Sequence, residues 1–168
     1  MINANGFREE VVRPALMALA EYDPRLYSED AVELMMGTAA QESDLGYYVT
    51  QIGDNPLEGL GPYSMELATS DSLWEHYLAF RPDLASIVRR LMTQDAFDSP
   101  ENLRRELINN SLYSTAMTRI KYWKVPEPMP STLWEWAAYW KEHFNTHLGK
   151  GTEEEFVMSY RKFVKGGF

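Results

Sequence analysis

The amino-acid sequence predicts a fold of the α+β class that is predominantly α-helical, with one small β-hairpin. Apolar residues recur at the three- and four-residue spacing of helices through most of the 168-residue chain. Several of these segments begin with residues typical of helix N-caps. One stretch differs. Residues 47–65 place β-branched and aromatic residues on either side of a turn-rich centre, Gly53-Asp54-Asn55-Pro56, which is typical of a hairpin.

Length and composition indicate a single soluble domain covering residues 1–168. Hydrophobic residues make up 45% of the chain and aromatic residues 13%, which argues against disorder. The absence of cysteine excludes a disulfide scaffold, thiolate metal sites and thiol catalysis. The net charge of −9 and the lack of a basic cluster argue against nucleic acid as a partner. No apolar run approaches the ~18–20 residues needed to cross a bilayer, so no membrane span is expected.

Two helices are predicted before the hairpin. The first covers approximately residues 8–22 and has apolar residues along one face. Pro14 leaves its start open, because proline is best tolerated in the first turn of a helix. The second helix is capped by Ser28 and is expected to run to about Gly46.

Helix signals return after the hairpin. The chain carries four possible N-terminal signals, namely Ser72 with Glu75, Ser99 before Pro100, Thr132 with Glu135, and Thr152 with Glu155. Residues 125–131, VPEPMPS, hold too many prolines for a helix and predict an extended connector within one domain. Six to eight helices are expected in all.

A single carboxylate follows the apolar face of the second helix. Val32, Met35, Met36 and Ala39 share that face, and Glu42 comes three residues later on the same side. Partial burial and the negative end of the helix dipole both raise the pKa of a carboxyl group in this position. A carboxyl that stays protonated near neutral pH can act as a general acid. The alternative is an edge residue that reaches solvent or caps a backbone amide.

Segments around and after Glu42 occur in a characteristic order. The chain has ESDLG, the expected hairpin, GLGPYSMELAT, YSTAMTRIKYW and then WEWAAYW. This order resembles the lysozyme superfamily, in particular the branch of soluble lytic transglycosylases and goose-type lysozymes. The resemblance covers approximately residues 30–145. It implies a lysozyme-like helical domain, with the hairpin beside the active-site helix, that cleaves the β-1,4 bond between MurNAc and GlcNAc in peptidoglycan. GLGPYSME and AAYWKEHFNTHLGKGT also resemble segments of phage-encoded proteins.

The resemblance implies roles for individual residues. It makes Glu42 the catalytic acid, and it assigns contacts with the glycan strand to Ser43, Gln51, Tyr63, Ser64, Met65 and Tyr139. Tyr139 matches the tyrosine of the family's AAYNAG motif. Its hydroxyl is expected either to bond to Glu42 or to bond to a backbone carbonyl as part of the core. Three departures from the family pattern are Ser64 in place of a glutamine, Trp140-Lys141 after the tyrosine, and the lack of a basic face for binding to the cell wall.

A second carboxylate decides between reaction types, because a hydrolase usually needs one as nucleophile or base. Asp54 and Glu58 are the candidates, since both can project from the expected hairpin over the glycan-binding cleft that the resemblance implies. Asp44 lies two residues from Glu42 and is expected on another face of the helix. If neither candidate serves, one acid suffices in the transglycosylase scheme, in which groups of the substrate replace the external base and water.

No metal and no other cofactor are expected. His143 and His147 have a spacing that can ligate zinc, but no glutamate lies between them and the sequence offers no obvious third ligand. Histidines near the C-terminal end of a helix are favoured by its dipole without a metal.

The expected partner is a peptidoglycan glycan strand, with other phage virion proteins as a further possibility. The N-terminus lacks the features of a signal peptide. The resemblance therefore implies a protein of the host cytoplasm or the virion that acts on the periplasmic cell wall when it is delivered there. The alternative function is a non-catalytic virion or glycan-binding protein of the same fold, which the negative charge and Ser64 favour.

Overall fold

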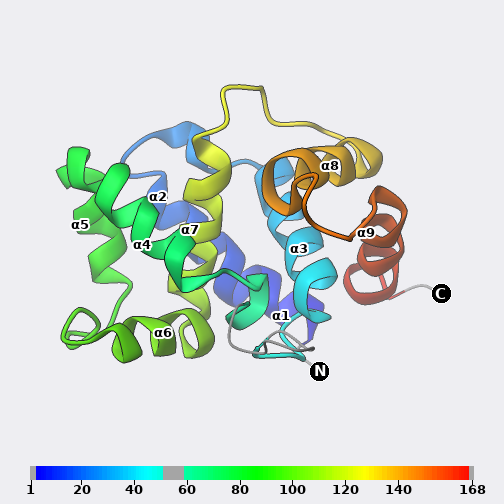
Figure 1. Cartoon of the computed structure of the whole chain (residues 1–168). Coiled ribbons are helices and arrows are strands. Elements are labelled where there is room, and N and C mark those ends of the chain that lie inside the picture. The colour runs from blue at the N-terminus through cyan, green and yellow to red at the C-terminus, as the bar shows by residue number, and fades with distance from the viewer. Residues whose placement is uncertain (1–2, 51–58, 167–168) are drawn as a thin grey trace.

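The computed structural model describes residues 3–50 and 59–166, and it confirms a predominantly helical fold (Figure 1). The α-helices are α1 (Ala4–Phe7), α2 (Arg13–Leu19), α3 (Glu29–Ser43), α4 (Leu67–His76), α5 (Pro82–Arg90), α6 (Pro100–Asn109), α7 (Ser111–Trp123), α8 (Leu133–Trp140) and α9 (Glu153–Ser159). Short 3-10 turns are η2 (Pro24–Leu26), η3 (Gly61–Tyr63) and η4 (Leu78–Phe80). Single π-helical turns are η1 (Arg8–Val12), η5 (Lys141–Asn145) and η6 (Tyr160–Val164). None of the described helices combines the length and apolar character that a membrane crossing requires.

The predicted β-hairpin is not shown. In the part of the chain that the structure describes, the segment contains isolated antiparallel bridges, between Thr50 and Leu60 and between Leu60 and Met65, and no strand. The predicted turn, Gly53-Asp54-Asn55-Pro56, lies outside the described residues. The bridge to Met65 encloses the 3-10 turn η3, so the chain reverses within a few residues.

The first helical segment starts earlier than predicted. Asn3 caps α1, where its side chain accepts a hydrogen bond from the Gly6 N–H at 2.9 Å. The helix continues through η1 into α2, so Pro14 lies well inside it. Proline has no N–H to donate, and its ring clashes with the carbonyl four residues earlier. The wider π turn directly before Pro14 separates these groups, which explains how the helix passes through a proline.

Most of the predicted helix starts are confirmed. Ser28 accepts a hydrogen bond from Ala31 N–H, and Ser99 caps α6. Thr132 and Thr152 form complete capping boxes at α8 and α9. The signal at Ser72 is wrong, because α4 already begins at Leu67 and Ser72 falls inside that helix. Residues 125–131 form the predicted non-helical connector, which arches from α7 to α8 (Figure 1).

Helix α3 is largely enclosed by other helices. Ten of its fifteen residues are buried, and it packs against α8, α9 and η6 on one side of the molecule (Figure 1). Gly37 allows α9 to approach α3 closely. A Cβ atom there would lie 2.3 Å from Cζ of Phe156 on α9. The helix that carries Glu42 is therefore fixed in place by the C-terminal helices.

The buried apolar residues form two clusters. One surrounds α3 and includes residues of α8 and α9, while the other lies among α4, α5, α6 and α7. Both clusters include residues of α2, namely Leu16 in the first and Leu19 in the second. The C-terminal end of α3 and the start of α4 belong to different clusters, and residues of both elements line the candidate site.

Candidate functional site

A cleft of about 480 Å³ opens at the C-terminal end of α3. One wall comes from the end of α3 and the residues after it, another from residues 64–69, and a third from α7 and η5. The side chains along it are mainly polar. The lining residues are Gln41, Glu42, Ser43, Asp44, Tyr48, Thr50, Ser64, Met65, Glu66, Thr69, Lys121, Phe144, Asn145 and Gly149.

Glu42 lies in this cleft and is only partly exposed. The indole Nε1 of Trp140, on α8, donates a hydrogen bond to Oε1 of Glu42 at 2.8 Å. Burial raises the pKa of Glu42 from 4.5 to about 7, and the hydrogen bond from Trp140 and the charge of Lys121 act against this rise. Near neutral pH, protonated and deprotonated Glu42 are therefore both populated.

Lys121 is the cationic group of the cleft. It comes from α7, and its Nζ donates to the Phe144 carbonyl at 3.3 Å and lies 3.9 Å from the centre of the Phe144 ring. Burial lowers the pKa of Lys121, while the charges of Glu42 and Glu66 raise it. The ammonium group is therefore close enough to both carboxylates for their charges to act on it.

Two serines join the end of α3 to the segment that follows. Oγ of Ser43 lies 2.6 Å from the Pro62 carbonyl and accepts a hydrogen bond from the Gly46 N–H at 2.7 Å. Oγ of Ser64 donates to the backbone carbonyl of Glu42 at 3.0 Å. The serines therefore fix the backbone around Glu42 as well as lining the cleft.

The backbone is strained around the cleft. In residues 3–50 and 59–166, the non-glycine residues with positive φ are Asp44, Leu45, Ser64 and Thr146. Asp44 and Ser64 line the cleft, and Leu45 and Thr146 are chain neighbours of lining residues. Such conformations cost roughly 1–3 kcal/mol each and tend to cluster at functional sites. Their position here supports a functional role for the cleft.

Two tyrosines to which the resemblance assigns glycan contacts do not line the cleft. Tyr63 is completely buried, and its hydroxyl is 3.0 Å from Oγ1 of Thr115 on α7. Tyr139 does not reach Glu42. Its hydroxyl donates to the backbone carbonyl of Glu127 at 3.4 Å, and its ring stacks on Tyr122. Of the two arrangements expected for Tyr139, the structure has the core tyrosine bonded to a carbonyl.

The carboxylates of the cleft also differ from expectation. Asp44 lines the cleft, although a helical wheel places it on another face, because α3 ends at Ser43 and Asp44 takes a left-handed conformation. Glu66, directly before α4, lines the cleft too. Gln51, Asp54 and Glu58 lie outside the described residues.

Sequence reasoning missed the two residues that act on Glu42, namely Trp140 behind the cleft and Lys121 in its wall. It also missed Glu66, a further carboxylate of the cleft. Trp140 had a signal, since it immediately follows the tyrosine of the matched motif and departs from that motif. Lys121 lies on a distant helix, and nothing in its local sequence distinguishes it from a surface lysine.

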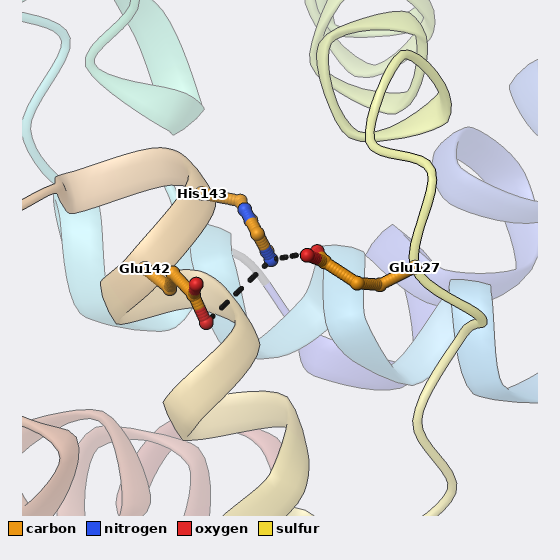
Figure 2. Close-up of side chains that lie close together, drawn as sticks. All are labelled: Glu127, Glu142 and His143. Carbon is orange, nitrogen blue, oxygen red and sulfur yellow. Dashed lines mark ion pairs between the residues drawn. The ribbon is translucent and has the colours of Figure 1, made fainter.

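His143 lies near the carboxylates of Glu127 and Glu142 (Figure 2). Glu142 precedes it in the sequence, but Glu127 is sixteen residues earlier, so the sequence does not indicate that the three lie together. Nε2 of His143 is 2.5 Å from Oε2 of Glu127, on the connector, and 3.8 Å from Oε2 of Glu142. One donor atom from each residue lies within 4.8 Å of the others, so the three side chains have the chemistry and spacing to hold a metal ion. The ion pair between His143 and Glu127 already satisfies these groups without one, and none of the three residues lines the Glu42 cleft.

Comparison of the chain with protein-family models, curated protein sequences and solved structures gave no match.

Proposed function

We propose that the protein is a lysozyme-like, peptidoglycan-cleaving glycosidase in which Glu42 is the general acid and base. The observation that carries this proposal is the state of Glu42, a partly buried carboxyl with a pKa of about 7 in a polar cleft. A general acid works best when its pKa lies near the working pH. The resemblance of the ordered segments around Glu42 supplies the substrate class.

Glu42 begins the reaction in its protonated form. It donates its proton to the oxygen of the glycosidic bond as the bond from that oxygen to C1 of MurNAc breaks. The carboxylate that results then accepts a proton from the incoming hydroxyl as that hydroxyl attacks C1. Trp140 donates its N–H to Oε1 throughout, and Oε2, which accepts no hydrogen bond from residues 3–50 or 59–166, carries out this proton transfer.

The source of the incoming hydroxyl distinguishes a hydrolase from a transglycosylase. Asp44 and Glu66 are the further carboxylates of the described cleft, and Lys121 supplies its positive charge. We propose the single-acid scheme, in which a hydroxyl of the substrate attacks. The charges of Glu42 and Glu66 both raise the pKa of Lys121, and in this scheme Glu66 helps to keep Lys121 protonated.

The test is the release of muropeptides from purified cell walls by the wild type and by Glu42→Gln. Glutamine is nearly isosteric and still accepts the Trp140 hydrogen bond, but it has no proton to donate. We expect activity to fall by about a thousandfold or more. Glu154→Gln is the matched control, because it makes the same chemical change at an exposed position of α9 and should keep full activity.

Mass spectrometry of the products tests the scheme. Anhydro ends identify a transglycosylase, and reducing ends, heavier by one water, identify a hydrolase. Full activity in Glu42→Gln would contradict the proposal. Wild-type protein that binds cell walls and releases nothing would support the non-catalytic, glycan-binding alternative.

A further inference from the structure

A second cavity, of about 460 Å³, lies among the connector of residues 125–131, α7 and α8. It has no lining residue in common with the Glu42 cleft. Its walls are mostly apolar or aromatic, and these lining residues are Tyr122, Trp123, Val125, Pro126, Pro128, Met129 and Tyr139. The volume falls within the range of small-molecule sites. Figure 1 shows the connector arching from α7 to α8.

One cationic side chain in the wall of this cavity is almost completely buried. Arg119, on α7, is 3% exposed. Its Nε donates to the Leu26 carbonyl at 2.9 Å and its Nη2 to the Arg25 carbonyl at 3.3 Å. In residues 3–50 and 59–166, no carboxylate lies within ion-pair distance of this guanidinium. A buried charge without a counter-charge is costly, and an anion in the cavity would offset that cost.

The charged groups nearby do not supply this counter-charge. Arg25 also lines the cavity, but its Nε and Nη2 both donate to Asp23, at 3.1 and 2.8 Å. Glu127 lines the cavity too, but its carboxylate is paired with His143 (Figure 2). The Cζ atoms of Arg25 and Arg119 lie 5.3 and 5.6 Å from the centre of the Trp123 ring. The cavity therefore has a cationic end, in a protein whose net charge is −9.

Burial lowers the pKa of Arg119 to about 10, so the side chain remains charged at neutral pH.

We propose that this cavity binds a small organic monocarboxylate, with the carboxylate on Arg119 and a compact apolar group against the connector. A planar guanidinium matches the geometry of a carboxylate and can bind it through two hydrogen bonds. The apolar walls favour a ligand with a hydrophobic body over a bare inorganic anion. The negative charge of the whole protein disfavours polyanions.

Phenylacetate is a suitable probe, with phenylacetamide as its neutral counterpart and inorganic phosphate as an anion without an apolar group. Isothermal titration calorimetry should give a dissociation constant for phenylacetate of about 1 mM or below, and binding of the other two at least about tenfold weaker. NMR should show shifts of the Arg119 Nε–H and the Trp123 indole N–H. Equal binding of phosphate, equal binding of phenylacetamide, or no shift with phenylacetate at concentrations of about 10 mM would each overturn the proposal.

Two variants locate the site. Arg119→Lys keeps the charge but loses the planar fork, and it should weaken phenylacetate binding about tenfold. The matched control is Arg89→Lys, because Arg89 also lies over an aromatic ring, Trp74, but does not line this cavity.

Met129→Trp covers the case in which Arg119→Lys does not fold. It fills the cavity from the connector and leaves Arg119 in place, so binding should be lost while the Arg119 resonance persists. Phenylacetate binding that survives this change would place the site elsewhere and overturn the proposal. None of these measurements depends on glycosidase activity, and the outcome is therefore independent of the proposed function.

Discussion

Among the described residues, Trp140 is the one whose side chain bonds to the carboxyl group of Glu42. Its N–H bonds to one carboxylate oxygen, and its ring is 1% exposed and packs on Phe156 at a centroid distance of 5.4 Å. A side chain held by packing and bonded to the acid restricts the rotamers available to the carboxyl, as catalysis requires. Tyr139, one residue earlier, contacts the connector instead.

The first prediction compares Trp140→Phe with Tyr139→Phe. Loss of the indole N–H should reduce turnover by roughly tenfold or more, which corresponds to about 1.4 kcal/mol. It should also raise the pKa of Glu42, because that hydrogen bond favours the charged form. Tyr139→Phe should change turnover less than about twofold. Kinetics on cell walls and NMR titration of the Glu42 carboxyl carbon measure both effects. A larger loss in Tyr139→Phe than in Trp140→Phe would return Tyr139 to the catalytic site.

The second prediction concerns Lys121. Its charge lowers the pKa of Glu42, so removing it in Lys121→Met should raise that pKa. The general acid must be protonated, and activity falls as pH rises through its pKa. The alkaline limb of the pH–activity profile should therefore move to higher pH in Lys121→Met. Lys121→Arg keeps the charge and serves as the control. An alkaline limb that stays in place would show that Lys121 does not act on the acid.

At the scale of elements, α3 depends on the C-terminal helices. Gly37 and Phe156 are in contact where α3 and α9 cross, and a Cβ atom at Gly37 would approach the Phe156 ring to 2.3 Å. A ring enclosed in a core cannot move aside without shifting its neighbours. The position of Glu42 is thus coupled to a segment more than a hundred residues away in the sequence.

The third prediction follows from this contact. Gly37→Ala should lower the free energy of unfolding by roughly 1–3 kcal/mol, because overpacking outweighs the helix propensity gained. Gly6→Ala is the matched control. It lies in α1 with no foreign atom closer than 3.8 Å to the added Cβ, and it should be neutral or stabilising by up to about 1 kcal/mol. Urea unfolding measures both. A stabilising Gly37→Ala would contradict the close packing of α3 on α9.

The local parts of these elements were predictable from the sequence. Caps at Ser28, Ser99, Thr132 and Thr152 depend on residues within one turn of the helix start, and all four are present in the structure. The passage of a helix through Pro14 was not predictable, since a π turn leaves no simple pattern in the sequence. The hairpin prediction relied on residue types alone, and the described part of that segment forms bridges around a 3-10 turn.

The candidate site was predictable where it depends on one helix and not where it depends on several. Helical spacing placed Glu42 at the end of the buried face of α3, and Glu42 lies in the cleft. Trp140 and Lys121 reach it from α8 and α7, and a single sequence does not encode such tertiary contacts in a readable pattern. The motif match assigned a role to Tyr139, whereas the residue bonded to Glu42 is its neighbour Trp140. One step along a helix turns the side chain by about 100°.

At the scale of the whole molecule, Glu42 links stability to pH. The pKa of its carboxyl is 4.5 as an ordinary value and about 7 in the fold. Between these two pH values the folded state binds more protons than the unfolded state, so this group makes the fold less stable as pH rises. Below about pH 4.5 the effect is absent, and above about pH 7 it is complete.

The fourth prediction is that Glu42→Gln removes this dependence. The free energy of unfolding of Glu42→Gln, minus that of the wild type, should increase by up to about 3 kcal/mol between pH 4.5 and pH 7. This difference should change little outside that pH window. Chemical unfolding at a series of pH values measures the difference, with Glu154→Gln as the control that should stay parallel to the wild type. A Glu42→Gln advantage that is greatest at low pH would contradict the raised pKa.

The hydrogen bond between Trp140 and Glu42 also gives the protein an internal optical reporter. Indole emission responds to the charge of a group bonded to the ring N–H, so the fluorescence of Trp140 should follow the titration of the carboxyl. Subtracting the pH titration of Glu42→Gln removes the signal of the other four tryptophans. Binding of a glycan strand that excludes water from the cleft would then register as a change in this same signal. The occupancy of the site and the protonation of its acid are in this way measurable in solution without a label or a chromogenic substrate.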